Sequence, residues 1–321
     1  MRYLIWFICT IVICTALGQN STNEFVIGGI FAKSEIEHET SFQIGITAVN
    51  KLYNDTKFVG ESKIINAKNT NEVSKATCEL LSLGAVGIIG PNTYPALAQV
   101  NQLTSKKQVP HFVIHSLDTA EVDSDSNSTT FVMFPHRESV GDVLAHLVTR
   151  RSWRSCVLLY ENADGLIRLQ KFLDLSGRGT KIAIRKIPSD ADIAPLLTEA
   201  IGKQLMYEYH DFIFTNLDVK TVDLEPYKVI CAKKCNITLL QLSQDDKNVE
   251  YLRAEFAKVA PFTAPDTGVQ ESTIAIYDSV LVLASAARFR LNATDIVPLD
   301  CSKQDTLIGG DLLVEDMKSV T

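Results

Sequence analysis

The sequence of 321 residues lacks the short motifs that mark the common enzyme classes. It contains no Gly-x-Ser-x-Gly turn for a serine nucleophile, no phosphate-binding Walker loop and no Gly-x-Gly-x-x-Gly dinucleotide fingerprint. Neither His111 with His115 nor His136 with His146 has metal-ligand spacing with a carboxylate in register. These histidines are more simply interpreted as core or solvated residues, and we expect no enzyme, no cofactor and no metal.

Long runs of one charge are also absent. The net charge of −7 is spread along the chain, which argues against nucleic acid or an anionic membrane surface as a partner. Beyond the first residues no segment is apolar enough to cross a bilayer, since the best one, residues 274–287, carries Asp278. With 46% hydrophobic and 21% charged residues the chain is globular, and its length suggests two lobes.

The first residues predict a signal peptide over residues 1–18. Arg2 supplies a positive start, residues 3–12 form a short apolar core, and small residues follow just before Gln19. A buried N-terminal strand is the alternative. Asn-x-Ser/Thr glycosylation sequons in polar segments agree with passage through the secretory pathway; they lie at Asn20, Asn54, Asn127, Asn236 and Asn292.

Few cysteines remain after the signal peptide. There are five, which in an oxidising compartment allow two bridges and one free thiol. Cys156 lies in an apolar run, so we expect a buried thiol there. Cys231 and Cys235 invite a zinc or redox interpretation, but no second pair or nearby histidine completes a metal site.

Short apolar runs alternate with longer amphipathic segments along the whole chain. This alternation predicts parallel sheets covered by helices on both faces. Two such sheets joined by several crossovers would form a hinged clamshell, with a cleft at the carboxyl ends of the strands. The expected strands are residues 25–31, 61–67, 85–89, 111–114, 131–134, 156–160, 182–187, 212–214 and 238–242, and the expected helices are residues 35–53, 71–83, 94–106, 137–151, 166–175, 191–200, 249–259 and 269–289.

Several long segments resemble the amino-terminal domain of kainate-type (non-NMDA) ionotropic glutamate receptors. They are residues 78–91, 161–173, 210–218 with 224–227, and 276–280, in the family's order. The resemblance implies an α/β fold of the bilobed periplasmic-binding-protein type I, with two parallel-sheet lobes and hinge crossovers. Lobe 1 would then be residues 19–117, lobe 2 residues 118–268, and residues 269–321 would return to lobe 1.

The resemblance also implies a function. In this family the domain chiefly drives dimerisation and subunit assembly, so the expected partners are other glutamate receptor subunits in a homo- or hetero-dimer or tetramer. The expected location is the extracellular face of the plasma or postsynaptic membrane, or the medium if the chain is expressed as given. A small-molecule-sensing ectodomain of a class C or natriuretic-type receptor is the alternative.

Two departures from the family pattern stand out. Residues 201–208 replace what would be a strand–helix unit of on the order of 20 residues in lobe 2. The chain also ends at Thr321, before the closing strands, ligand-binding core and pore of the family. We therefore expect a fragment, an aberrant product or an incomplete gene model that cannot conduct ions.

The resemblance further implies particular site residues. Cys78 should pair with Cys301 as in the family. Apart from the resemblance, Cys231 with Cys235 is a second candidate pair, which would need a tight turn. The turn before the helix at residues 94–106 could hold a carboxylate in the cleft through Asn92, Thr93 and Tyr94, although helix capping by Thr93 is the favoured alternative.

The same helix is expected to contribute to the dimer interface. One stripe (Tyr94, Leu97, Ala98 and Asn101) is assigned to the partner, and a second (Ala96, Val100 and Leu103) to the lobe's own core. The alternative is that both stripes are intramolecular.

Overall fold

The structure is a computed structural model. It describes residues 23–93, 96–114, 128–136, 138–160, 163–187, 193–203, 210–215, 217, 223–227, 235–242, 247–259 and 269–320. The predicted signal peptide, residues 1–18, lies outside the described residues.

The largest element of the fold is a five-stranded parallel sheet with the order β2-β1-β3-β4-β5. The central strand β3 is buried along its whole length, because helices cover both faces of the sheet and leave no position for a polar side chain. The parallel α/β class expected from the alternation is therefore present. The strands are β1 (Asn23–Ala32), β2 (Thr56–Ile65), β3 (Ala85–Ile89), β4 (His111–Val113) and β5 (Thr130–Val132).

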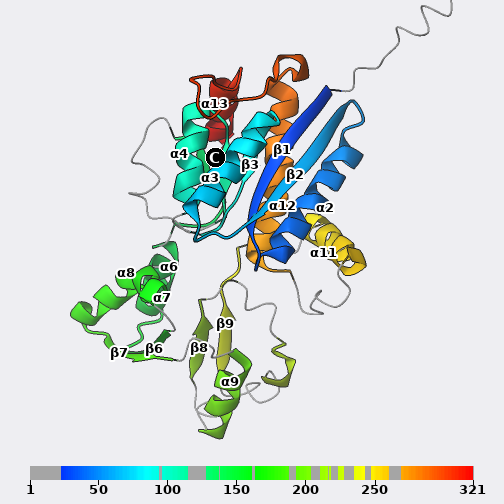
Figure 1. Ribbon diagram of the computed structural model, residues 1–321. Helices are drawn as coiled ribbons and strands as arrows, with labels where there is room; N and C mark the ends of the chain where they lie inside the picture. The colour runs from blue at the N-terminus through cyan, green and yellow to red at the C-terminus, as the bar shows by residue number, and fades with distance from the viewer. Residues whose placement is uncertain are drawn as a thin grey trace, which may run out of the picture.

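The helices of this sheet form one layer on each face (Figure 1). On one face α2 (Ile36–Leu52) and α12 (Glu271–Arg290) pack side by side, and α3 (Thr70–Ser82) and α4 (Ala96–Lys107) do so on the other. Gly45 permits close packing of the first pair, since a Cβ there would lie 3.0 Å from Val280. The placement of the helices follows from the right-handedness of strand–helix–strand crossovers. From β1 the chain moves to one side of the sheet to form β2, and it then moves to the other side to form β3 and β4. Right-handed connections in opposite directions place their helices on opposite faces.

The C-terminal segment completes the same core. It contains the short 3-10 turn η4 (Ala293–Asp295) and α13 (Gly310–Val320), and α13 packs against α12. Leu313, Val314 and Met317 of α13 join the main apolar cluster. We call the five-stranded sheet with these helices the first unit.

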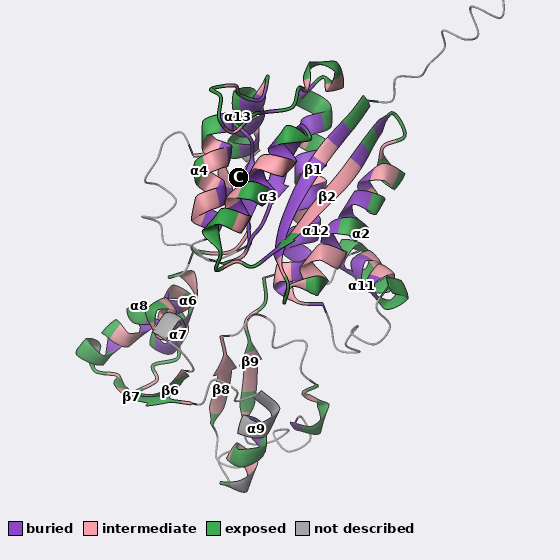
Figure 2. Ribbon diagram, in the orientation of Figure 1, coloured by how far each residue is buried: buried purple, intermediate pink, exposed green. Residues whose placement is uncertain are grey.

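The second unit, residues 138–242, is built from smaller pieces. One piece has a two-stranded parallel sheet and its own apolar cluster, in which Leu144, Leu158 and Phe172 are buried. Figure 2 shows that buried residues are concentrated in the first unit and sparse in the second. The elements of this piece are α6 (Ser139–Arg150), β6 (Ser155–Tyr160), α7 (Ala163–Arg168), α8 (Gln170–Leu173), η1 (Asp174–Arg178) and β7 (Lys181–Lys186).

The other piece consists of α9 (Ile193–Gly202), β8 (Asp211–Phe214) and β9 (Asn236–Leu239). Its two strands pair in parallel, and Leu197 and Tyr227 form its small buried cluster. Within the part of the chain that the structure describes, no ladder joins β8–β9 to β6–β7. The two pieces meet through the Ile213 side chain and through Arg151, whose guanidinium lies 3.8 Å from the Asp211 carboxylate.

Two elements lie in a different unit from the one expected. The strand at residues 131–134 was assigned to lobe 2, but β5 pairs with β4 and closes the first sheet. The helix α11 (Lys247–Val259) was also assigned to lobe 2, but it packs on α2 and α12. The apolar stripe of α11 is buried by packing against Ile44 of α2 and Tyr277 of α12.

Candidate functional site

The candidate site lies at the carboxyl edge of the five-stranded sheet, where β1 and β3 are neighbours. The chain leaves β1 toward one face and β3 toward the other, so this is the topological switch point at which α/β sheets bind ligands. After β3 the chain turns sharply at Gly90, whose φ is +78°. A Cβ at Gly90 would lie 2.4 Å from the Ile30 carbonyl oxygen, so the turn requires glycine.

A chain of polar contacts centred on His38 crosses this edge. The Asn92 amide nitrogen lies 3.2 Å from His38 Nδ1, and His38 Nε2 lies 3.0 Å from the Ser272 hydroxyl. Glu35 approaches the same ring nitrogen as Asn92, with Oε2 4.0 Å from Nδ1. The ring thus connects the loop after β1, the turn after β3 and the start of α12.

Glu35 is held ionised in this cluster. Its burial raises the carboxyl pKa, but the His38 contact and a 2.8 Å hydrogen bond from the Ala32 backbone N–H together outweigh burial and place the pKa below the ordinary value of 4.5. The carboxylate also shapes the loop after β1, because it ties the last residue of the strand to the start of α2. A negative charge is therefore part of this edge at neutral pH.

One acceptor in the cluster has no partner among the described residues. The Asn92 Oδ1 atom is buried and makes no hydrogen bond there. A buried carbonyl oxygen without a donor is costly, so this atom is available to a donor from a ligand. Of the other two cleft residues expected, Thr93 is exposed and its carbonyl accepts from Leu97 N–H at 3.0 Å, whereas Tyr94 lies outside the described residues.

His111 holds the turn after β3 in place through a hydrogen bond to Gly90. It is fully buried in β4, and its Nε2 donates to the Gly90 carbonyl at 3.0 Å. Burial lowers the His111 pKa from 6.5 to about 4, although the bond to Gly90 acts in the opposite direction. The residue is therefore a neutral core histidine at physiological pH.

The residues assigned to a dimer interface divide between two environments. Leu97 is 4% exposed and packs on Val113 inside the first unit, so it is not on the surface of the single chain. Asn101 is half-buried, and its Oδ1 accepts from the Thr130 hydroxyl at 2.6 Å. Ala98 is half-buried, and Ala96 and Val100 lie in the main core.

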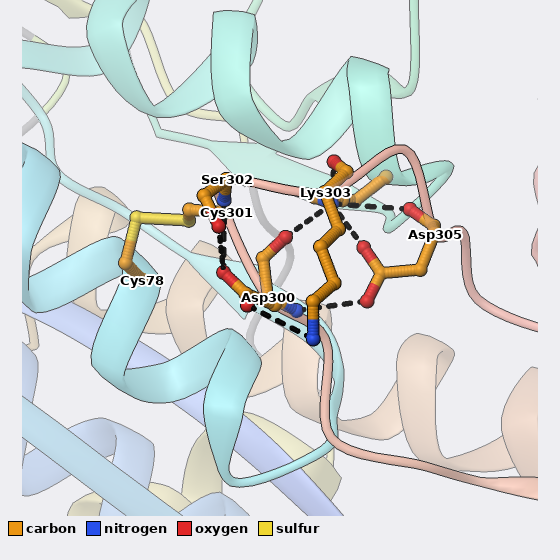
Figure 3. A network of polar contacts seen from close by, with 7 residues as sticks. Cys78, Asp300, Cys301, Ser302, Lys303 and Asp305 are labelled. Carbon is orange, nitrogen blue, oxygen red and sulfur yellow. Dashed lines mark hydrogen bonds and ion pairs between the residues drawn. A yellow bond between two sulfur atoms is a disulfide. The ribbon is translucent and has the colours of Figure 1, made fainter.

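A second polar cluster fixes the C-terminal segment to α3 and α4. The structure joins Cys78 of α3 to Cys301 with a Cα–Cα distance of 5.7 Å. Figure 3 shows the residues beyond Cys301 folded into a tight loop. There Asp300 accepts from the Ser302 hydroxyl at 2.7 Å and from its backbone N–H at 2.9 Å, which lowers the Asp300 pKa to about 2.

The buried Lys107 anchors this loop from α4. Its ammonium donates to the backbone carbonyls of Asp300 at 2.6 Å and Lys303 at 2.8 Å, and it pairs with the Asp305 carboxylate. The Asp305 pKa is lowered, first by the Asp300 backbone N–H and then by Lys107. A buried lysine needs such a set of acceptors, so the cluster is structural.

The remaining predicted modification residues are placed only in part. Asn54 and Asn292 are exposed, and Asn236 is exposed with its amide donating to Asp211 Oδ1 at 2.6 Å. Asn20, Asn127 and Cys231 lie outside the described residues, so the pairing of Cys231 with Cys235 stays a prediction. Cys156 is a free, half-buried thiol whose pKa is raised by burial.

No group of histidine, cysteine and acidic residues suited to a metal ion occurs in the described ranges. Contrary to the expectation for residues 274–287, one described helix, α12, is long and apolar enough to span a membrane by length and composition. Its apolar residues are largely buried between α2 and the sheet, as expected of a core helix.

Comparison with known proteins agrees with this architecture. The model of the receptor family ligand binding region matches residues 41–206. The mouse and human proteins called glutamate receptor ionotropic, kainate 1 are each 25% identical to the chain over 339 residues, which covers 94% of the chain. The chain spans 40% of the mouse protein and 36% of the human one, well under two thirds of either.

Proposed function

Since this chain belongs to the family of receptor ligand-binding regions, we propose that it is the extracellular amino-terminal domain of a kainate-like ionotropic glutamate receptor subunit and that it mediates subunit dimerisation and assembly. The similarity to kainate 1 receptors over 94% of the chain carries this proposal. In this proposal the domain has the bilobed clamshell fold of the periplasmic-binding-protein type I. It passes through the secretory pathway and is exposed at the plasma or postsynaptic membrane.

The surface proposed for dimerisation is the outward face of α3 and α4. Lys75, Gln102 and Lys106 are exposed on it, and Glu79 is half-buried between Lys63 at 2.9 Å and Lys75 at 3.9 Å. Leu97 lies in the core, and the exposed side chains of α3 and α4 are mainly polar. A two-fold contact would place the lysines of one subunit against Glu79 of the other. Such a contact is screened by salt, so we expect weak association that high ionic strength abolishes.

Sedimentation of the secreted chain tests the dimer. Wild type should associate in a concentration-dependent manner at low salt, and reversing charge with Lys75→Glu plus Lys106→Glu should weaken association at least tenfold. Lys258→Glu on α11, which packs on the helix layer of the opposite face, is the matched control and should leave association unchanged. A chain that sediments as a monomer at every concentration contradicts the proposal, and equal loss in the control shows a non-specific charge effect.

A second function has one observation in its favour. Asn92 Oδ1, buried beside Glu35 and His38 and unpartnered among the described residues, suits a small ligand that brings an N–H donor to the carboxyl edge of the sheet. Calorimetric titration with L-glutamate and with glycine tests this sensing function. Heat of binding that disappears in Asn92→Ala supports a sensor, and no heat with either amino acid leaves assembly as the function.

A further inference from the structure

The ends of α2 and α12 form a joined surface at the amino end of the first sheet. Both helices end there, beside the start of β1 (Figure 1). Arg288 on the last turn of α12 binds the Asp55 carboxylate through two nitrogens, at 3.0 and 2.6 Å, and its guanidinium carbon lies 4.7 Å from the centre of the Tyr53 ring. The loop after α2 is thus fixed to the end of α12.

Two glycosylation sequons lie at this surface. Asn54 is in the loop that Arg288 holds, and Asn292 follows α12 by two residues. Both side chains are exposed, and Asn292 makes no capping hydrogen bond to the turn that follows it. Asn236 differs, because its amide nitrogen already donates to Asp211. Asn54 and Asn292 therefore project to solvent from one end of the fold without loss of a native contact.

The same two helix ends carry unusually exposed apolar side chains. Leu52 on the last turn of α2 is 64% exposed, and Phe289 on the last turn of α12 is 78% exposed. Exposed apolar residues at a rigid surface favour self-association unless something covers them. A glycan suits this role, because it is bulky and solubilising while the C–H faces of its sugar rings pack on aromatic rings.

We propose that N-linked glycans on Asn54 and Asn292 together cover the amino end of the α2–α12 layer, shield Leu52 and Phe289, and close this end to protein partners. The donor is a lipid-linked oligosaccharide. A bond forms between the asparagine Nδ2 and C1 of the first N-acetylglucosamine, and the bond from C1 to the diphosphate oxygen breaks. The polyprenyl diphosphate leaves with the electron pair, and the amide proton passes to a base.

Occupancy is tested on the full chain expressed in a eukaryotic secretory host. Peptide mass spectrometry before and after peptide N-glycosidase should find glycan on both residues. Thr294→Ala should remove the glycan at Asn292, whereas Thr294→Ser keeps the sequon and should restore it. Unmodified Asn54 and Asn292 in the secreted wild type would overturn the proposal.

Shielding is tested with Asn54→Gln plus Asn292→Gln. At high salt, where the proposed dimer is dissociated, this variant should bind a hydrophobic fluorescent dye several-fold more strongly than wild type and should self-associate where wild type does not, and adding Phe289→Ser should reverse both changes. The charge reversal on α3 and α4 should not reverse them, which separates this end from the proposed dimer face. A doubly unglycosylated variant that is as monodisperse and as dye-silent as wild type would refute the shield.

Discussion

The two units of the molecule start from the same alternation of strands and helices and reach different degrees of completeness. In the first unit five strands form one sheet whose central strand is wholly buried. In the second unit, β6 and β7 expose most of their residues, and Val157 and Leu159 are 68% and 51% exposed on one face. A local pattern is enough to specify strands and helices, but a core requires that neighbouring strands form one sheet.

The short interval at residues 201–208 offers a physical reason for this difference. The strand pairs β6–β7 and β8–β9 lie on either side of it in the sequence, and no described strand joins them. An apolar strand face without a covering helix and a strand edge without a ladder are both destabilising and prone to association. We expect the second unit to be less stable than the first unit and to unfold before it.

The largest effect should come from Leu97→Glu in the first unit. Leu97 is buried against Val113, and a carboxylate there has no partner, so the variant should lose several kcal/mol and fail to fold. Gln102→Glu, on the exposed side of the same helix, should remain folded. Circular dichroism and secretion yield measure both. A folded Leu97→Glu chain that only loses self-association would return this position to the dimer interface.

Removal of the disulfide should be the next largest effect. The bridge closes a loop with a sequence separation of 223, for which chain entropy gives roughly 5 kcal/mol as an upper bound. Cys78→Ser should therefore lower the denaturation midpoint strongly. Cys156→Ser, at the free thiol of the second unit, should change it little. Peptide mapping without reductant that finds both Cys78 and Cys301 free would contradict the pairing.

Matched truncations compare the two units directly. Leu80 is fully buried in the first unit, so Leu80→Ala should cost about 2–5 kcal/mol in unfolding free energy. Leu159 is half exposed in the second unit, so Leu159→Ala should cost less than about 0.5 kcal/mol. Denaturant titration followed by tryptophan fluorescence and by circular dichroism measures both. Equal costs would mean that the β6–β7 face is covered in solution.

A smaller effect concerns pH. The His111 pKa is about 4 in the folded chain against an ordinary 6.5, so the unfolded chain binds the proton more tightly between these values. Stability is therefore lost as pH falls from about 6.5 to 4, by roughly 3 kcal/mol from this group. His111→Gln should flatten the pH dependence in that interval. An unchanged slope would show that His111 is already solvated.

Much of the fold was predictable from the sequence, and the misses have identifiable causes. The strand at residues 85–89 has the bounds of β3, because a continuous apolar run between glycines has few alternatives. The strand β2 begins at Thr56, five residues before the predicted start, because an edge strand tolerates polar residues and Gly60. The helix α13 was not predicted, since its burial depends on contacts with α12.

The site residues divide in the same way. Asn92 was expected at the cleft because its turn lies just before a helix, a local signal, and a ligand there stays a prediction. His38 and Ser272 were missed because they are 234 residues apart and meet only in the fold. The sequence feature that could have identified them is that each lies near the start of a helix, at the carboxyl edge of the first sheet. Leu97 was assigned to the wrong environment for a single chain, because α4 buries one broad arc that includes Ala96, Leu97 and Val100.

Hydrogen exchange measured by mass spectrometry on the secreted chain tests the contrast between the two units most directly. We predict that the backbone amides of β1, β3 and β4 exchange only by global unfolding of the first unit. Those of β6 and β7 should exchange at least a hundredfold faster, without unfolding of the first unit. Equal protection of both sets of strands, with one cooperative transition for the whole chain, would contradict the account.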